Sequence, residues 1–236
     1  MDIINYAKEI FDSEIEELKI VKEKIDSEMI DVVNIILESK GKVVVTGIGK
    51  SGLIGKKIAA TLASTGTYAV FMNSAEGLHG DLGMISKEDV VLAISNSGNS
   101  DEIVAILPSI KKIGAKIVAM TGNRNSKLGR AAYKILNIGV KREGCPLNLA
   151  PMSSTTSTLV MGDALAAILI KMRDFKPENF ALYHPGGSLG KRLLMRVSDV
   201  MHKDDKIPFC DKESSIDNVI LVMTEKRLGA VCVMNG

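Results

Sequence analysis

The feature that most constrains the fold of this 236-residue chain is a repeated order of three segments. A short run of Val and Ile comes first, then a loop of glycine and hydroxyl residues, then a stretch with helical spacing. The run Asp89–Ile94, the loop Ser95–Ser100 and the apolar pattern Ile103–Ile113 are the clearest example. Short apolar runs of this kind are typical of buried strands. Their alternation with helices predicts an α/β fold, with a mostly parallel sheet and helices on both faces.

The same alternation predicts five strands. They are expected at Val43–Val45, Tyr68–Phe71, Asp89–Ile94, Lys116–Met120 and Ile135–Ile138. The helical spacing of apolar residues predicts further elements outside the strands. These are a helical region at Asp2–Ser39 with a second helix at Asp26–Glu38, a helix through Ile54–Leu62, a short helix at Leu128–Tyr133 and a long apolar helix at Leu159–Lys171. Ligands of parallel sheets bind outside the carboxyl ends of the strands, where both glycine- and serine-rich loops are expected to lie.

The loop Ser95–Ser100 has two interpretations. As a strand-to-helix connection it can bind an anion, because backbone N–H groups and the positive end of a helix dipole point at one place. Gly98 allows close approach of the backbone, and Ser95, Ser97 and Ser100 can each donate a hydrogen bond. The alternative is an ordinary turn in which Ser100 is the helix N-cap. The loop by itself leaves both interpretations open.

The loop Gly47–Gly52 matches two nucleotide-binding patterns incompletely. It has the GxGxxG spacing between a strand and a helix, but Met72–Ser74 lacks the acid that a dinucleotide site requires at the end of the next strand. A P-loop would need glycine where this chain has Val44. What remains is a tight loop with one cation, Lys50, at the same edge as the serine loop. A second hydroxyl-rich segment, Ser153–Thr158, precedes the long apolar helix and fits either helix capping or a further substrate contact.

Composition excludes several classes of protein. The net charge is only +2 with basic and acidic residues intermixed, and aromatic residues make up 4% with no Trp, which argues against nucleic-acid binding. No apolar run reaches the roughly 18 residues of a membrane span, and the N-terminus lacks a signal-peptide pattern. The three cysteines are far apart, which predicts a reduced cytoplasmic protein without disulfides.

Four ionisable residues in predicted loops or loop ends are candidates for chemistry: His79, Glu102, Glu143 and His184. Each alone is more often a solvated or structural residue, and Glu102 also fits a first-turn acid favoured by the helix dipole. Their spacing matches no HxH or HExxH pattern, so a metal site is not predicted. A GxSxG nucleophile elbow is also absent from the sequence.

Several motifs occur together in a fixed order. They are Gly49–Gly52, His79–Gly83, Ser95–Gly98, Cys145–Pro151 with Ser153–Thr156, and His184–Gly187. This set closely resembles the D-arabinose-5-phosphate isomerases, sugar isomerase (SIS) domain proteins that usually carry a C-terminal pair of CBS motifs. The resemblance covers about Gly41 to Met201, and the tail from Val197 resembles only the start of a first CBS motif. It implies a three-layer, flavodoxin-like doubly wound SIS domain at 1–196, including N-terminal helices at 2–39, and a partial CBS motif at 197–236. The last strand, Gly229–Met234, is expected to lack a partner.

The resemblance also implies the site residues. Positions implicated in catalysis in the family match Lys50, Glu102, Glu143 and His184. The expected substrate contacts are Ser51, Gly66, Thr67, His79, Ser95, Ser97, Ser100, Ser153, Ser154 and Thr155. Some members have a histidine implicated in zinc binding where this chain has Asn73, so neither a metal nor a cofactor is expected.

The implied reaction interconverts D-arabinose 5-phosphate and D-ribulose 5-phosphate through a cis-enediol. Glu143 is expected to be the base at C2, with Glu102 as an alternative base or as the residue that orients Lys50. His184 would open the sugar ring, Lys50 would counter negative charge, and the hydroxyl loops would bind the phosphate. The product would enter 3-deoxy-D-manno-octulosonate synthesis or, in paralogues, sugar-alcohol catabolism.

Two other functions remain open from the sequence. They are a non-catalytic phosphosugar sensor and an aminosugar-phosphate isomerase. A regulator would be expected to carry a helix-turn-helix, which the N-terminal helices do not resemble. The expected partners are a sugar phosphate and further copies of the chain, as a homotetramer with shared active sites, and neither nucleic acid nor membrane.

Overall fold

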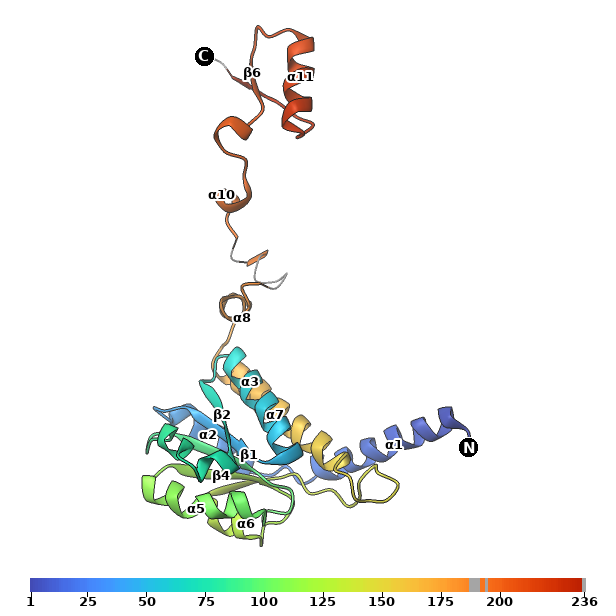
Figure 1. Ribbon diagram of the computed structural model, residues 1–236, viewed down its shortest axis with the longest axis vertical. Coiled ribbons are helices and arrows are strands. Elements are labelled where there is room, and N and C mark those ends of the chain that lie inside the picture. The colour runs from blue at the N-terminus through green and yellow to red at the C-terminus, as the bar shows by residue number, and fades with distance from the viewer. Residues whose placement is uncertain (187–191, 194, 235–236) are drawn as a thin grey trace. The chain divides into compact units, whose positions relative to one another are not determined.

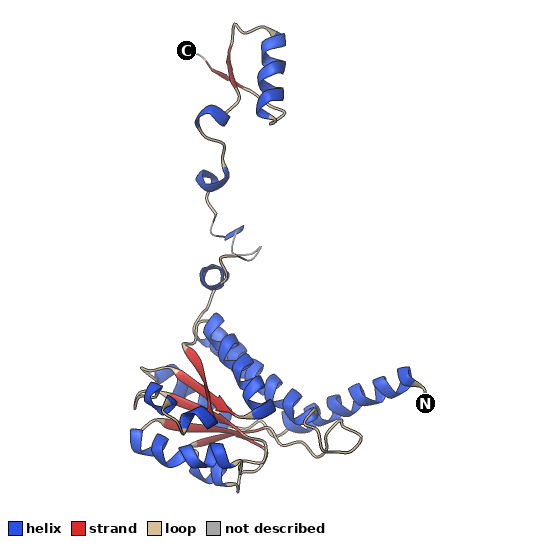
Figure 2. Ribbon diagram, in the orientation of Figure 1, coloured by secondary structure: helices blue, strands red, loops and turns tan. Residues whose placement is uncertain are grey.

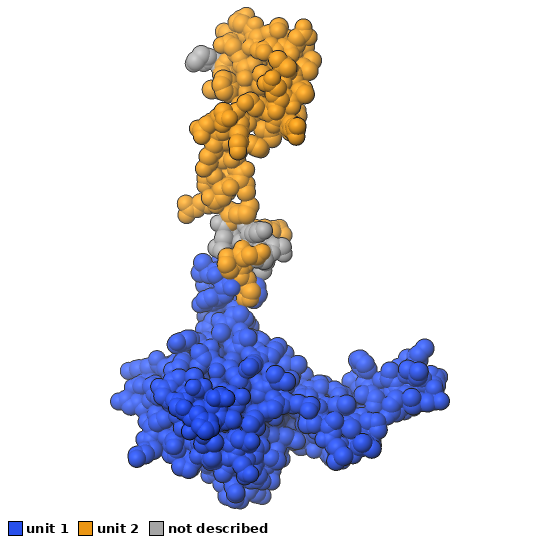
Figure 3. Space-filling model, viewed as in Figure 1, with its two compact units in different colours: residues 1–183 blue, residues 184–236 orange. Residues whose placement is uncertain are grey.

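The structure is a computed structural model that describes residues 1–186, 192–193 and 195–234. The chain forms two compact units, Met1–Tyr183 and His184–Gly236, which are coloured separately in Figure 3. The sequence-based boundary between an SIS domain and a CBS-like tail lies later, after residue 196. Each unit is described below by itself.

The first unit is built on a five-stranded parallel sheet (Figures 1 and 2). Its strands are β1 (Val43–Gly47), β2 (Ala69–Asn73), β3 (Val90–Ile94), β4 (Lys116–Thr121) and β5 (Lys134–Asn137). Their order in the sheet is β2-β1-β3-β4-β5, and all neighbouring pairs are parallel. The five predicted strands are confirmed within two residues at each end, and so is the doubly wound α/β class.

Burial explains why these segments form strands. Every residue of β1 and β3 is buried, because these strands have neighbours on both sides and helices on both faces. Runs of β-branched residues suit such positions, where strands do not alternate between apolar and polar side chains. The register sets Val45 beside Leu92 and Thr46 beside Ala93, so the carboxyl ends of β1 and β3 finish at the same level.

Helices cover the two faces in separate layers. The helices of the unit are α1 (Ile3–Lys22), α2 (Glu28–Glu38), α3 (Gly49–Ser64), α4 (Ser74–Gly77), α5 (Asp101–Ile113), α6 (Lys127–Ala131), α7 (Ser153–Met172) and α8 (Pro177–Tyr183), with a 3₁₀ turn η1 (Asp81–Met84). One apolar core lies between the sheet and α2, α3 and α7. A second core lies on the opposite face, under α5 and α6. The predicted N-terminal helical region is confirmed as two helices, α1 and α2.

The central helix of the first layer is α7. By length and hydropathy alone its 20 residues would suffice to cross a membrane. Half of the helix is buried inside the unit, however, and it packs tightly along α3. A Cβ atom at Gly162 would lie only 2.5 Å from the side chain of Ile58. The apolar character of α7 therefore serves the core of this unit.

Helix α1 packs differently from the rest. Its buried residues are Ser13, Glu17 and Val21, of which only the last is apolar. Glu17 is 3% exposed, and its Oε2 accepts a hydrogen bond of 2.6 Å from the backbone N–H of Lys141. Glu14 Oε2 accepts a bond of 2.7 Å from Thr156 Oγ1 at the start of α7. Polar contacts therefore connect α1 to the segment after β5.

The second unit holds a small βαβ arrangement. It contains α10 (Val197–Val200), a 3₁₀ turn η2 (Asp204–Lys206), β6 (Phe209–Asp211), α11 (Ile216–Lys226) and β7 (Cys232–Met234). Strand β7 pairs in parallel with β6. The expectation that the last strand has no partner was wrong, because the three-residue strand β6 is too short to stand out in the sequence.

A buried ion pair closes the amino edge of the sheet. Lys42 Nζ donates to Asp89 Oδ2 at 2.8 Å, and the backbone N–H groups of Lys42 and Ser86 each donate to the Asp89 carboxylate at 2.8 Å. The Asp89 side chain is 1% exposed. Burial alone would raise the pKa of Asp89, but the hydrogen bonds from Lys42 and Ser86 outweigh it and hold the pKa below the ordinary 3.8. The ionised form is thus the one that the fold stabilises.

We expect Asp89→Asn to lower the free energy of unfolding by about 3 kcal/mol at pH 7, because it leaves Lys42 without its counter-ion. A lowered pKa means that the carboxylate contributes stability above pH ~4 and loses that contribution as the pH falls through the folded-state value. Urea unfolding at pH 7 and near pH 3 should therefore show that the free energies of unfolding of wild type and variant differ less in acid. Glu88→Gln, at a more exposed neighbouring carboxyl group, is the control and should change little.

Candidate active site

The carboxyl edge of the sheet contains a topological switch point between β1 and β3. The chain leaves β1 into α3 on one face and leaves β3 into α5 on the other face. Loops on the two sides of such a point diverge and leave a crevice between them, which is where ligands of doubly wound sheets bind. The two glycine- and serine-rich loops of the sequence are the loops that flank this switch point.

The serine loop is folded in advance of any ligand. Ser95 is 3% exposed, its Oγ lies 3.0 Å from Ser100 Oγ, and it accepts a bond of 3.1 Å from the N–H of Gly98. The N–H of Asn99 donates to Ser97 Oγ at 3.2 Å. Ser100 does occupy the N-cap of α5, yet its side chain makes no capping bond. The first N–H groups of α5 therefore remain available to an external acceptor.

Gly98 fixes the path of this loop. Its φ is +66°, and a Cβ atom there would lie 2.0 Å from Ser126 Oγ. The Gly98 carbonyl accepts a bond of 2.9 Å from the N–H of Leu128, and Asn99 Oδ1 accepts one of 2.9 Å from Lys127. The serine loop thus satisfies the start of α6 while leaving the start of α5 open.

The start of α3 is open in the same way. Ile48 is its N-cap and offers no side-chain acceptor. A Cβ atom at Gly52 would lie 2.9 Å from the carbonyl oxygen of Gly47, so the helix begins directly against the end of β1. Lys50 is exposed and Ser51 is half-buried in this first turn. Two helices without side-chain caps therefore begin on neighbouring strands, and an anion at this edge would meet N–H groups, hydroxyls and one cation.

Glu143 lies in the segment between β5 and α7. Its Oε2 accepts hydrogen bonds from the N–H groups of Met152 at 2.7 Å and Ser154 at 3.1 Å. The carboxylate therefore caps α7 and complements the positive end of its dipole. Among the described residues Oε1 of Glu143 has no hydrogen-bond partner. Oε2 is held by these two bonds, while Oε1 can accept a proton or a hydrogen bond from a ligand.

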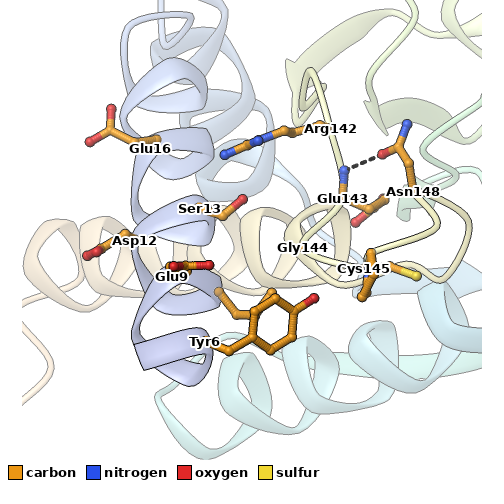
Figure 4. Close-up of a pocket in the computed structure, with 12 residues that line it drawn as sticks. Tyr6, Glu9, Asp12, Ser13, Glu16, Arg142, Glu143, Gly144, Cys145 and Asn148 are labelled. Carbon is orange, nitrogen blue, oxygen red and sulfur yellow. Dashed lines mark hydrogen bonds between the residues drawn. The ribbon is translucent and has the colours of Figure 1, made fainter. Parts of the chain in front are cut away.

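Glu143 lines a pocket of about 690 Å³ between α1 and the segment 142–148. Figure 4 shows Glu143, Asn148 and Arg142 on one wall and Tyr6 and Glu9 of α1 on the other. Cys145 also lines it, and backbone N–H groups of Ala150, Leu149 and Leu147 hold the pKa of its thiol below the usual value. The segment thus brings a carboxylate and a thiol to one pocket.

The hydroxyls at the start of α7 take different roles. Ser153 is 1% exposed and its Oγ has no hydrogen-bond partner among the described residues. The N–H of Ser154 donates to Glu143, and Thr155 Oγ1 donates to the carbonyl of Met152 at 2.8 Å. Capping and packing account for part of this cluster, and Ser153 has a fully buried hydroxyl without a partner among the described residues.

Most of the predicted site residues follow strands at this edge. Lys50 and Ser51 follow β1, His79 follows β2 and α4, Ser95, Ser97, Ser100 and Glu102 follow β3, and Glu143 and Ser153–Thr155 follow β5. Asn73, where some relatives have a histidine, caps α4 by accepting the N–H of Ala75. Within the described part of the chain no group of three or more His, Cys, Asp and Glu side chains is arranged to hold a metal ion.

Three predicted residues lie elsewhere. Gly66 and Thr67 connect α3 to the start of β2, at the amino edge of the sheet, where the ring of Phe175 covers Gly66. Within this chain they are on the side opposite the two loops. His184 belongs to the second unit, and Gly187 of its motif lies outside the described residues.

Sequence reasoning missed Asn148 and the α1 glutamates. Asn148 Oδ1 accepts a hydrogen bond of 2.7 Å from the N–H of Glu143 (Figure 4). Its φ of 52° is one that Asn tolerates better than most residues. An Asn shortly after Pro146 was therefore the available signal, whereas nothing in the sequence marks Glu14 or Glu17 among the other acids of α1.

Comparison with known proteins identifies the family. The SIS domain family matches residues 36–168. Arabinose 5-phosphate isomerase KdsD of Pseudomonas aeruginosa is 48% identical over 235 residues, which is 100% of this chain and 72% of that protein. KdsD of Escherichia coli K12 is 54% identical over 194 residues, which is 82% of this chain and 59% of that protein.

A solved structure matches the first part of the chain. It is the c3406 protein of E. coli CFT073 in complex with arabinose 5-phosphate, with a TM-score of 0.76 and 42% identity. The match covers 78% of this chain and 98% of that one. With both the sheet order and these likenesses in hand, the chain is a member of the arabinose 5-phosphate isomerase family of SIS domain proteins.

Proposed function

We propose that this chain interconverts D-arabinose 5-phosphate and D-ribulose 5-phosphate through a cis-enediol intermediate. Two observations support the proposal: an anion site is open at the starts of α3 and α5, and Glu143, in the segment after β5, has only one of its carboxylate oxygens held. The names of the relatives and the arabinose 5-phosphate complex of a related structure support the choice of sugar.

The reaction moves a proton between C2 and C1 and needs a base, a group that protonates oxygen and a place for the phosphate. The serine loop and Ser51 would bind the phosphate, with Ser153 as a further donor. Fixing the phosphate holds the reacting carbon against the base, and such positioning can contribute up to about 7–11 kcal/mol. No cofactor is needed for this proton transfer.

Glu143 is the residue that we assign as the C2 base. It lines a pocket, and the N-terminus of α7 holds one carboxylate oxygen while the other has no partner among the described residues. Lys50 would counter the negative charge that develops on the enediolate oxygens. Glu102, in the first turn of α5, would orient Lys50 or act as the base in its stead.

His184 would open the sugar ring and exchange protons with its oxygens. An imidazole is suited to this because it can both donate and accept a proton near neutrality. His79 would contact the substrate. We further propose that the product feeds 3-deoxy-D-manno-octulosonate synthesis.

The chain would work as a homotetramer with shared sites. An apolar groove of about 310 Å³ runs between α1 and α7, lined by residues such as Ile15, Ile25 and Val160, each 46% exposed. A second copy would cover these side chains. Gly66, Thr67, His79 and His184 are then candidates to act at a neighbouring copy's site.

We expect Glu143→Gln to lower kcat by about 10²–10⁴-fold, the usual contribution of a positioned base. Gln keeps an oxygen that can accept the bonds from Met152 and Ser154, so the melting temperature should stay near that of wild type. Exchange of the C2 hydrogen with solvent deuterium should be lost as well. Undiminished exchange in this variant, with loss in Glu102→Gln, would move the role of base to Glu102.

Ser95→Ala and Ser97→Ala should each raise KM for arabinose 5-phosphate by about tenfold, because a hydrogen bond to a charged phosphate is lost. Steady-state kinetics would measure this, with Ser64→Ala in the C-terminal turn of α3 as a matched control. Unchanged KM in both variants would reject the phosphate site at this loop.

Turnover assays should compare arabinose 5-phosphate, ribulose 5-phosphate and glucosamine 6-phosphate. We expect conversion of the first two only. Turnover of the aminosugar would indicate a different isomerase, and thermal stabilisation by a phosphosugar without turnover would indicate a sensor.

If active sites are shared between copies, two different inactive variants should complement each other in a mixed oligomer. Glu143→Gln and His184→Ala chains, each inactive, should regain activity when they are co-expressed and purified as mixed oligomers. Activity that stays at the level of the separate variants would show that each site uses residues of one copy.

A further inference from the structure

The segment that carries Glu143 is closed on itself by one side chain. Asn148 Oδ1 accepts the hydrogen bond from the Glu143 N–H at 2.7 Å, across five residues of chain (Figure 4). The N–H of Asn148 in turn donates to the carbonyl of Cys145 at 2.8 Å. The Asn148 side chain therefore connects the backbone of Glu143 to the turn that the backbone of Asn148 closes.

Glu143 is thus held from two directions. Its carboxylate is bound by N–H groups of α7, and its backbone is bound by Asn148. Fixing both ends of a side chain restricts the torsions between them, which decides where the free oxygen points. The segment is also fixed just before Glu143, where Glu17 accepts the N–H of Lys141. Asn148 provides the corresponding bond to the residues that follow.

The conformation of Asn148 suits this role. Its φ of 52° lies in the left-handed region, which Asn and Asp occupy more readily than most residues and Gly occupies freely. The N–H of Asn148, which donates to the Cys145 carbonyl at 2.8 Å, supports the same turn without the side chain. The turn therefore has a backbone bond that remains when the Asn148 side chain is removed.

We propose that Asn148 is a positioning residue of the active site, which aligns the free oxygen of Glu143 with the substrate through its bond to the Glu143 backbone. The inference rests on the proposed role of Glu143. It assigns to Asn148 an effect on the chemical step, since a carboxylate that is displaced by about 1 Å loses much of the advantage of position.

The chain offers a pair of substitutions that separates this role from simple folding. Asn148→Gly removes the side-chain acceptor and suits the positive φ, so the turn should remain folded. Asn148→Asp retains an oxygen at the same place and a residue type that tolerates this conformation. Leu149→Ala is the control, because that side chain is 78% exposed in the same segment.

We expect Asn148→Gly to lower kcat by about tenfold with KM and melting temperature little changed, and Asn148→Asp to recover most of the loss. Leu149→Ala should behave as wild type. In a Glu143→Gln background the Gly substitution should have no further effect on kcat, because the two residues act through one group.

Each contrary result is distinct. A rise in KM with unchanged kcat would make Asn148 a substrate contact, and an additive loss of kcat in the double variant would separate it from Glu143. A lower melting temperature for both Asn148 variants would make it a structural residue only. Wild-type protein without activity on arabinose 5-phosphate would overturn the proposed function itself.

Discussion

The switch point between the parallel strands β1 and β3, where the strand order of the sheet reverses, is the constraint on which the rest of this structure depends. Parallel strands need crossover helices, and the hand of those crossovers decides the face on which each helix packs. Because the chain proceeds to β2 on one side of β1 and to β3 on the other, α3 and α5 diverge to opposite faces. Their first turns are left at one edge with N–H groups that no side chain of their caps satisfies. The anion site is thus a result of topology. The serines add hydroxyl donors to it, and Gly98 fixes the path of the loop.

The segment from β5 to α7 adds the chemistry. It leaves the edge strand β5 and returns to the helix layer that contains α3, and on the way it carries Glu143 past α1 to the start of α7. Its conformation depends on bonds from several directions: α7 to the carboxylate, Asn148 to the backbone, and Glu17 of α1 to Lys141. Helix α1, which buries one apolar residue, stabilises the segment through carboxylates more than through hydrophobic contact.

The sequence was sufficient for the elements whose signal is local. The apolar runs at Val43–Val45 and Asp89–Ile94 predicted β1 and β3, because a fully buried strand is apolar along its whole length. Ser100 was an N-cap in only one of the two interpretations of its loop; it does occupy that position, but its hydroxyl makes no capping bond, which depends on the path of the loop. The strand β6 was missed because three residues carry too little pattern.

Contacts between distant parts of the chain could not be predicted in this way. Glu17 and Lys141 are 124 positions apart, and the pairing exists only because α1 lies beside the segment after β5. The same holds for Gly66 and Thr67, which share residue types with the serine loops but follow a helix and precede a strand. Residue type alone does not distinguish the amino edge of a sheet from its carboxyl edge, whereas the position relative to the strand does.

Because Glu143 also caps α7, its conservation in related proteins has two possible causes. A lineage that lost the isomerisation and kept only sugar binding would still need an acceptor for the N–H groups of Met152 and Ser154. Selection for a folded α7 would then preserve the glutamate after its chemistry had become useless. Persistence of this acid across paralogues is therefore weak support for catalysis. Conservation of Asn148, which bonds to the Glu143 backbone, would be better support for catalysis than conservation of Glu143 itself.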